Sequence, residues 1–422
     1  MASMSTRLLN LSLHGANLAT RFLFVFFLAK YLKPSDVGYY GLFTAAVGYS
    51  LYFVGLDFYA YVTREIVKTP LEERGRLLKG QAALSGILYL LFVPVAYAFL
   101  YQYSGWPSHL LIWFLPLLVL EHFNQEMSRL LIALSEQVSA SIVLFVRQGS
   151  WALTAVAIMH FDESSRQLDV VMLLWTISGL ASALIAISKL RMLGIKGWKD
   201  SLDWHWIKRG IAVSTAFLVA TLALRGIQTF DRYWLEAIGG VEVVAAYVLF
   251  TGVAGSLLAF LDAGVFSFAY PMFIKLSNEK NIDLLRSKLW QTLGVTVMLS
   301  ACFAAVSWFA LPYLLQWIGK EAYITAISFY PWLLLASITN AVGLVPHLAL
   351  YASGQDKTII HSHIAAFITF GVAVWALRGH SGPLAVPQGI VISFFLILTW
   401  KAAACWRYLL TMQERKIVLQ FP

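Results

Sequence analysis

Apolar runs long enough to cross a lipid bilayer follow one another along the whole chain, and no other feature limits the fold as strongly. A membrane-spanning helix needs about 20 predominantly apolar residues. The 422 residues are 59% hydrophobic and only 13% charged, and the mean hydropathy is +0.71. A soluble core of this size does not need so much apolar sequence. The sequence therefore predicts an integral membrane protein.

Apolar length and turn signals divide the chain into about twelve expected transmembrane helices. Their predicted ranges are 8–32, 38–62, 81–103, 109–133, 141–160, 169–190, 210–235, 243–270, 290–317, 323–351, 358–378 and 385–409. The expected fold class is an all-α polytopic membrane protein. The loops between these ranges are too short for a soluble catalytic domain on either side.

The first expected span carries a polar stripe. Asn10, His14, Asn17 and Arg21 follow one another at spacings of 4, 3 and 4, which places them on one helical face. Arg21 lies near the middle of the span, where an arginine costs roughly 2.5–3.5 kcal/mol on insertion scales. A charge held at that depth normally faces a bundle interior or a water-filled cavity.

The same stripe recurs in the second half of the chain. Ser214, Leu218, Thr221 and Arg225 stand 204 positions after the first four residues (225 − 21 = 204), and the later stripe continues through Gln228 and Arg232. Six spans per half is an even number, so both halves enter the membrane in the same orientation. We therefore predict two six-helix lobes related by a parallel pseudo-two-fold repeat.

The distribution of Lys and Arg predicts the topology. Most lie in segments that are cytoplasmic if the N-terminus is inside, and these segments are taken to include Lys401 near the end of the chain. The positive-inside rule then places both termini in the cytoplasm. This bias, with attraction to anionic lipid, explains the net charge of +9 without a nucleic-acid partner.

The predicted domains are an N-terminal lobe at 1–190, a cytoplasmic linker at 191–209 and a C-terminal lobe at 210–422. The linker contains Trp198, Trp204 and Trp206 among Lys and Asp residues, which favours a helix lying in the membrane interface. A plain anchoring loop is the alternative interpretation.

Arg21 and Arg225 are the strongest candidates for a functional site. They would form a cationic site that faces a central cavity between the lobes; the alternative is that a carboxylate on a neighbouring helix neutralises each one. Arg147 is a third candidate for anion binding. The polar residues expected to line the cavity are Asn10, His14, Asn17, Ser214, Thr221 and Gln228.

Acidic residues inside the spans are candidates for ion coupling. Glu121 and Glu126 belong to a polar cluster with His122 and Arg129 that forms either a structural ion-pair network or part of the cavity wall. The other candidates lie toward the inner ends of two spans, where they relay protons or pair with an arginine such as Arg64; they are Asp57 and Asp262.

The remaining polar residues suggest no catalysis. His361 and His363 point apart on a helix, so they form no metal pair, and with His347 they are expected to be hydrogen-bonded packing or cavity residues. Cys302 and Cys405 lie in apolar runs without metal-site spacing. The sequence lacks GxSxG, HExxH and Walker A motifs, so we expect neither an enzyme nor a cofactor or metal.

Three stretches carry a resemblance to a known family. They are Ala29 to Tyr40 (AKYLKPSDVGYY), Gly55-Leu56-Asp57 with Thr63 to Ile66, and Asp231-Arg232-Tyr233 with Tyr247. In them the chain resembles the Wzx-type polysaccharide transporters, which are flippases of lipid-linked oligosaccharides in the multidrug/oligosaccharidyl-lipid/polysaccharide exporter superfamily.

The resemblance implies two six-helix lobes around a cationic cavity, in the inner membrane of a bacterium. An undecaprenyl-diphosphate-linked oligosaccharide would cross from the cytoplasmic to the outer leaflet for surface polysaccharide synthesis. The implied partners are this substrate, membrane lipids, a polysaccharide polymerase and a chain-length regulator. A lipid II flippase, a drug/cation antiporter of the same superfamily and a membrane-embedded glycan polymerase or ligase remain alternatives.

Overall fold

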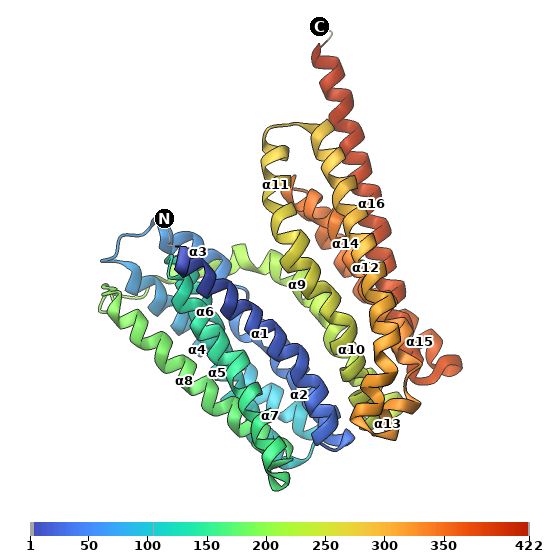
Figure 1. Ribbon diagram of the computed structural model, residues 1–422. Helices are drawn as coiled ribbons and strands as arrows, with labels where there is room; N and C mark the ends of the chain where they lie inside the picture. Colours follow the sequence, from blue (N-terminus) through green and yellow to red (C-terminus); the bar gives the residue numbers. More distant parts are fainter. Residues whose placement is uncertain (1–3, 104, 421–422) are drawn as a thin grey trace. The chain divides into compact units, whose positions relative to one another are not determined.

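A computed structural model gives the fold of the chain as helices joined by short connections (Figure 1). It describes the backbone of residues 4–103 and 105–420, and the side chains of 9, 12–13, 15–102, 105–215 and 218–412. Within these ranges the structure contains no β-strand. The chain divides into two compact units, Met1–Leu218 and Val219–Pro422.

Unit 1 is a helical bundle. Its elements are α1 (Met4–Tyr31), α2 (Pro34–Gly55), α3 (Tyr59–Lys68), α4 (Arg74–Tyr103), α5 (Ser108–Ala133), α6 (Gln137–Phe145), the π turn η1 (Val146–Ser150), α7 (Trp151–Phe161), the short 3-10 helix η2 (Glu163–Ser165) and α8 (Leu168–Met192).

Unit 2 is a second bundle, and α9 crosses the boundary between the units. Its elements are α9 (Trp204–Gly239), α10 (Val241–Leu261), the π turn η3 (Asp262–Phe266), α11 (Ser267–Asn278), α12 (Ile282–Ile318), α13 (Glu321–Thr325), α14 (Phe329–Ala352), α15 (Asp356–Ser381), the 3-10 helix η4 (Gly382–Leu384) and α16 (Ala385–Gln420).

Each predicted span coincides with one helix or with helices separated by a π turn or a short break. By length and composition alone, seven helices of the described chain are apolar enough to cross a membrane, or up to nine if each bent pair is one span. The continuous stretch Asp356–Met412, which contains both α15 and α16, counts once in that number. The prediction of an all-α polytopic membrane protein is confirmed.

The second predicted span is broken. α2 ends where Leu56 and Asp57 adopt left-handed φ angles of 49° and 51°, and α3 continues at an angle of 51°. Non-glycine residues in this conformation cost on the order of 1–3 kcal/mol and occur more often at functional sites. Asp57, predicted near the inner end of a span, therefore lies at a bend.

Aromatic side chains fill the core of unit 1. Trp151 of α7 stacks on Trp175 of α8 with ring centroids 5.3 Å apart, and Phe24 of α1 meets Trp151 edge-on at 4.8 Å. Such pairs contribute about 0.5–1.5 kcal/mol each beyond their burial. They hold α1, α7 and α8 together on the side of the bundle that contains η1.

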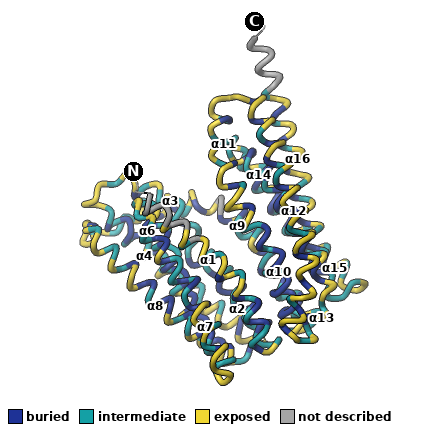
Figure 2. The backbone as a smooth tube through the Cα atoms, viewed as in Figure 1, coloured by how far each residue is buried: buried dark blue, intermediate teal, exposed yellow. Residues whose placement is uncertain are grey.

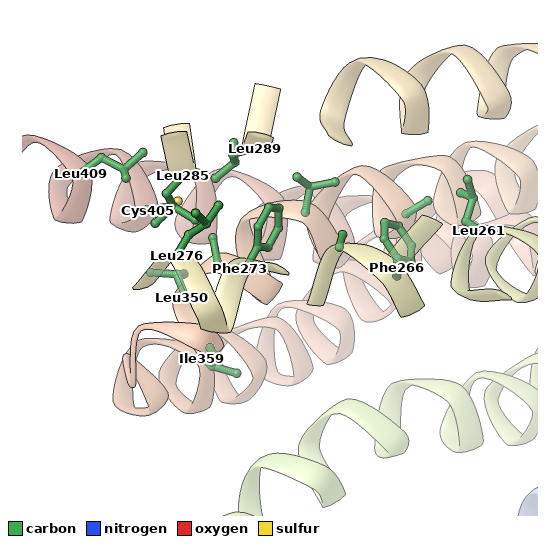
Figure 3. Packing of buried hydrophobic residues seen from close by; sticks show 14 of the residues in the cluster. Leu261, Phe266, Phe273, Leu276, Leu285, Leu289, Leu350, Ile359, Cys405 and Leu409 are labelled. Atoms are coloured by element: carbon green, nitrogen blue, oxygen red, sulfur yellow. The ribbon is translucent and has the colours of Figure 1, made fainter. Parts of the chain in front are cut away.

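An aliphatic and aromatic cluster forms a core of unit 2 (Figure 3). The cluster contains Phe266 near Leu261, and Phe273 nearer to Leu285 of α12 and Cys405 of α16. Apolar residues are also plentiful on the outside of both units, where the tube of Figure 2 is exposed. Leu90 of α4 is 78% exposed and Phe309 of α12 is 73% exposed, as suits helices that face lipid.

Residues 193–203 form a non-helical segment that docks on unit 1. The backbone N–H of Gly75 donates to the carbonyl of Lys196 at 2.7 Å, and Lys79 Nζ donates to the carbonyl of Asp200 at 2.5 Å. The first part of α9, Trp204–Thr215, follows, and its Trp206 packs against Tyr61 at 5.2 Å. The division into two domains joined by a linker at 191–209 stays a prediction.

Candidate functional site

The polar stripe of α1 leads to a glutamine on η1. Arg21 is exposed on unit 1, and its Nη1 donates to Oε1 of Gln148 at 3.4 Å. One turn earlier, Asn17 is buried and donates from Nδ2 to the same oxygen at 3.3 Å. The side chains of Asn10 and His14 lie outside the described residues. Gln148 is not among the site residues predicted from the sequence. The only sequence signal for it is its position next to Arg147 in an apolar run.

The π turn decides where Gln148 points. π turns widen a helix by one residue and are frequent at functional sites. Here α1 packs against α6, η1 and α7, and Gly149 allows the close approach. A Cβ at Gly149 would lie 2.8 Å from the ring of Phe145 and 3.4 Å from Oδ1 of Asn17. A larger residue there would first clash with the ring of Phe145, which would have to move.

Arg147 lies on the other side of the π turn in a buried ion pair. Its Nε donates to Oε2 of Glu121 on α5 at 2.8 Å, and both side chains are less than a tenth exposed. Trp175 Nε1 donates to the second oxygen of Glu121 at 2.8 Å. The structure thus joins a predicted anion-binding residue to a predicted coupling residue, and the role of each stays a prediction.

The second acidic residue of α5 is also paired. Glu126 accepts from Nη1 of Arg129 at 2.7 Å and from Nε2 of Gln81 at 2.6 Å. The guanidinium of Arg129 stacks over the ring of Tyr59, 3.5 Å from its centroid, next to the bend at Asp57. Two predicted residues, Glu121 and Glu126, therefore belong to networks with partners inside unit 1.

The stripe of α9 repeats the arrangement of α1 in part. Arg225 is exposed, and its Nη1 donates to Oε1 of Gln228 at 2.9 Å. Thr221 is half-buried one turn earlier, while Ser214 is buried. A guanidinium beside a glutamine amide oxygen is thus present in each unit, but the glutamine comes from η1 in one and from the same helix in the other.

Asp231 has a structural partner on the next helix. Its Oδ2 accepts from the hydroxyl of Tyr247 on α10 at 2.5 Å, and the side chain is buried. Both residues belong to the family-like stretches. Asp262, by contrast, is exposed as the first residue of the π turn η3.

No carboxylate neutralises the two candidate arginines within the described ranges. The ion pairs found there include Arg147 with Glu121 and Arg129 with Glu126, but none that contains Arg21 or Arg225. Neutralisation by a neighbouring carboxylate is therefore not observed among the described side chains, and the role of both arginines in a cavity stays a prediction.

One prediction about a basic residue is wrong. Lys401 was assigned to a cytoplasmic segment, but it is 3% exposed in the interior of unit 2. Its Nζ lies 3.0 Å from Nδ1 of His347 and 2.9 Å from Nε2 of His363. Charge counting misplaced Lys401 because it treats every lysine near a span end as solvated.

A family model described as "Polysaccharide biosynthesis protein" matches residues 8–277, which is 270 of the 422 residues. No curated protein is similar enough to match the chain.

Solved transporter structures share the fold over nearly the whole chain. An inward-facing multidrug resistance MATE family transporter of the MOP superfamily matches with a TM-score of 0.78 at 13% identity, covering 96% of this chain and 99% of that one. The lipid II flippase MurJ in an inward closed conformation gives 0.68 at 13% identity, covering 99% and 92%. The Vibrio cholerae MATE transporter VcmN gives 0.64 at 14% identity, covering 97% and 99%. Matched transporters have 12 helices in two lobes, the architecture predicted from the sequence.

Proposed function

Because the chain belongs to the polysaccharide biosynthesis protein family, we propose that it is a flippase for a lipid-linked oligosaccharide. The substrate would be an undecaprenyl-diphosphate-linked repeat unit, moved from the cytoplasmic to the outer leaflet by alternating access. The protein would lie in a bacterial inner membrane with both termini in the cytoplasm. It would carry out no covalent chemistry and would supply surface polysaccharide synthesis.

The observation that carries the proposal is the pair of exposed arginines, Arg21 and Arg225, that hydrogen-bond to glutamine and form no ion pair in the described chain. A diphosphate bears about two negative charges. Two unit charges 4 Å apart attract by about 1 kcal/mol in water and about 4 kcal/mol at the effective dielectric near a protein surface. Guanidinium groups are always charged and bind phosphate oxygens bidentately.

The neighbouring polar groups have roles in the proposal. Asn17, Thr221 and the glutamines Gln148 and Gln228 would hydrogen-bond to the diphosphate or to sugar hydroxyls. Arg147, already paired with Glu121, would fix the π turn that presents Gln148. The lipid tail would stay in the bilayer.

The charges argue against the other superfamily activities. A drug/cation antiporter needs an acidic site to attract an organic cation, whereas the exposed charges here are arginines. The fold match to MATE transporters is compatible with both activities because identities near 13% support the fold alone. A lipid II flippase remains the main alternative because its substrate carries the same diphosphate, and the lipid II flippase MurJ shares the fold.

The test is transport by single-arginine variants. Arg21→Ala and Arg225→Ala should each abolish surface polysaccharide in cells and flipping of a fluorescent undecaprenyl-diphosphate sugar in proteoliposomes. Arg21→Lys should be only partly active if bidentate binding matters. Arg191→Ala removes an exposed arginine at the end of α8, outside both stripes, and should transport normally.

The amount of monodisperse protein after purification controls for folding. Normal flipping by both alanine variants would contradict the proposal. Lipid II and a sugar-linked undecaprenyl diphosphate, offered separately, would distinguish the two flippase activities.

A further inference from the structure

Three basic side chains from three helices meet inside unit 2. They are His347 of α14, His363 of α15 and Lys401 of α16. The ammonium group lies 3.0 Å from Nδ1 of His347 and 2.9 Å from Nε2 of His363. The two imidazole rings stack with centroids 6.1 Å apart. The lysine, at 3% exposure, and His363, at 7%, are shielded from solvent.

Within the described part of the chain, this Lys–His–His cluster has no acidic partner. Among the described residues, no Asp or Glu forms an ion pair with Lys401. The ring of His363 also bonds to the backbone carbonyl of Ala220 on α9. α12 packs against α16 as well, and its described buried polar side chains are the uncharged Thr292, Thr296, Ser300 and Ser307.

The other titratable groups near the cluster are weak acids. Tyr351 of α14 stacks on His347 at 6.3 Å and meets Tyr270 of α11 at 5.7 Å. Cys405 lies one helical turn after Lys401 on α16 and is buried. None of these groups supplies the negative charge that a structural buried ion pair would have.

The hydrogen bonds within the cluster are compatible with the release and uptake of one proton by Lys401. An ammonium group only donates, so a charged Lys401 requires an unprotonated acceptor nitrogen on each histidine. When the ammonium loses a proton, one N–H bond breaks and the electron pair stays on Nζ, which can then accept from an imidazole N–H. The proton leaves to water. The charge in the core of unit 2 changes by one while the three side chains keep their contacts.

We propose that Lys401, His347 and His363 form a proton-binding site that couples proton movement to the transport cycle. The cluster joins α14, α15 and α16, and through Ala220 it reaches α9, the helix that carries Arg225. Ionisable groups inside membrane proteins commonly mark proton relays. The coupling rests on the proposed flippase function, but binding of the proton does not.

The first experiment measures the proton without any substrate. Purified protein in weakly buffered detergent solution is titrated between about pH 5 and about pH 9, a range in which an exposed lysine stays charged. The wild type should bind about one proton more than Lys401→Met across this range. Lys275→Met removes an exposed lysine of the same unit and should match the wild type.

Lys401→Arg keeps a permanent cation that cannot release a proton and should also lose the extra proton. His363→Gln keeps an acceptor for Lys401 and supplies a second test if the lysine variants fail to fold. Titrations of wild type and Lys401→Met that superimpose would overturn the site.

The second experiment links the site to transport. Proteoliposomes with a fluorescent undecaprenyl-diphosphate sugar are given a pH gradient, and one coupled proton predicts an accumulation ratio that changes about tenfold per pH unit. Lys401→Arg should lose this response. A wild type that flips nothing would contradict the flippase, whereas one that flips but ignores the gradient would contradict coupling; the substrate-free titration is independent of both.

Discussion

Four arginines inside the helices fall into two kinds, which differ in their partners. Arg147 and Arg129 each pair with a glutamate of α5, and these pairs are largely buried. Arg21 and Arg225 are exposed and donate to glutamine oxygens. An amide oxygen orients a guanidinium without cancelling its charge. In the proposed function the exposed arginines would bind the charged ligand, whereas the paired arginines join helices of unit 1.

At the residue scale, we predict that Glu121→Gln destabilises the protein strongly. The change leaves Arg147 buried without a counter-charge, and breaking a buried pair in this way costs about 3–5 kcal/mol. The thermal melting temperature of purified protein should fall clearly. Glu163→Gln, on the exposed loop before α8, should change stability by no more than about 0.5 kcal/mol.

The double variant Glu121→Leu/Arg147→Met removes both charges and should recover much of the lost stability. If Glu121→Gln melts like Glu163→Gln, the ion pair does not hold α5 against η1.

Several of the candidate functional residues lie where a π turn or a bend interrupts a regular helix. The π turn η1 contains Arg147 and Gln148, the π turn η3 begins with Asp262, and the bend after α2 contains Asp57. In each case the interruption changes the direction of a polar side chain relative to a regular helix. Helical spacing alone therefore cannot tell where these side chains point.

At the element scale, we predict that Gly210→Ala weakens the docking of the first part of α9 on α3. The added methyl carbon would clash with the ring of Phe58 and lie 2.5 Å from Cδ1 of Tyr61. Overpacking of this kind costs typically about 1–3 kcal/mol. The melting temperature should fall, whereas Gly255→Ala, where no described atom lies within 4 Å of the new methyl, should have little effect. Equal melting of both variants would show that the segment is not tightly packed.

The membrane topology concerns the whole molecule. The basic segments expected in the cytoplasm include the docked linker at 193–203, and an expected outer loop joins α7 to α8. The burial of Lys401 removes one charge from the cytoplasmic count, but the other basic segments keep the bias. The orientation predicted by the positive-inside rule is therefore unchanged.

At this scale, we predict opposite labelling of two introduced cysteines. In a Cys302→Ala/Cys405→Ala background, Glu163→Cys should react with a membrane-impermeant maleimide in intact spheroplasts. Ser201→Cys should react only after lysis, although both positions are exposed. The reverse pattern would invert the topology and with it the proposed direction of transport.

The sequence by itself determined the all-α polytopic fold class, the repeated arginine stripes and the family. Apolar length fixes which segments can span a membrane, and helical periodicity fixes which residues share a face. Both are properties of consecutive residues. Arg21 and Asn17 could therefore be identified before any contact was known.

Only the tertiary structure decided which charges are neutralised and which are not. Arg147 meets Glu121 across 26 positions, and Lys401 meets His347 across 54. Gln148 reaches Arg21 because a π turn shifts its direction. These outcomes depend on how helices distant in sequence pack, and the free energy of a buried charge depends on the neighbour it finds there.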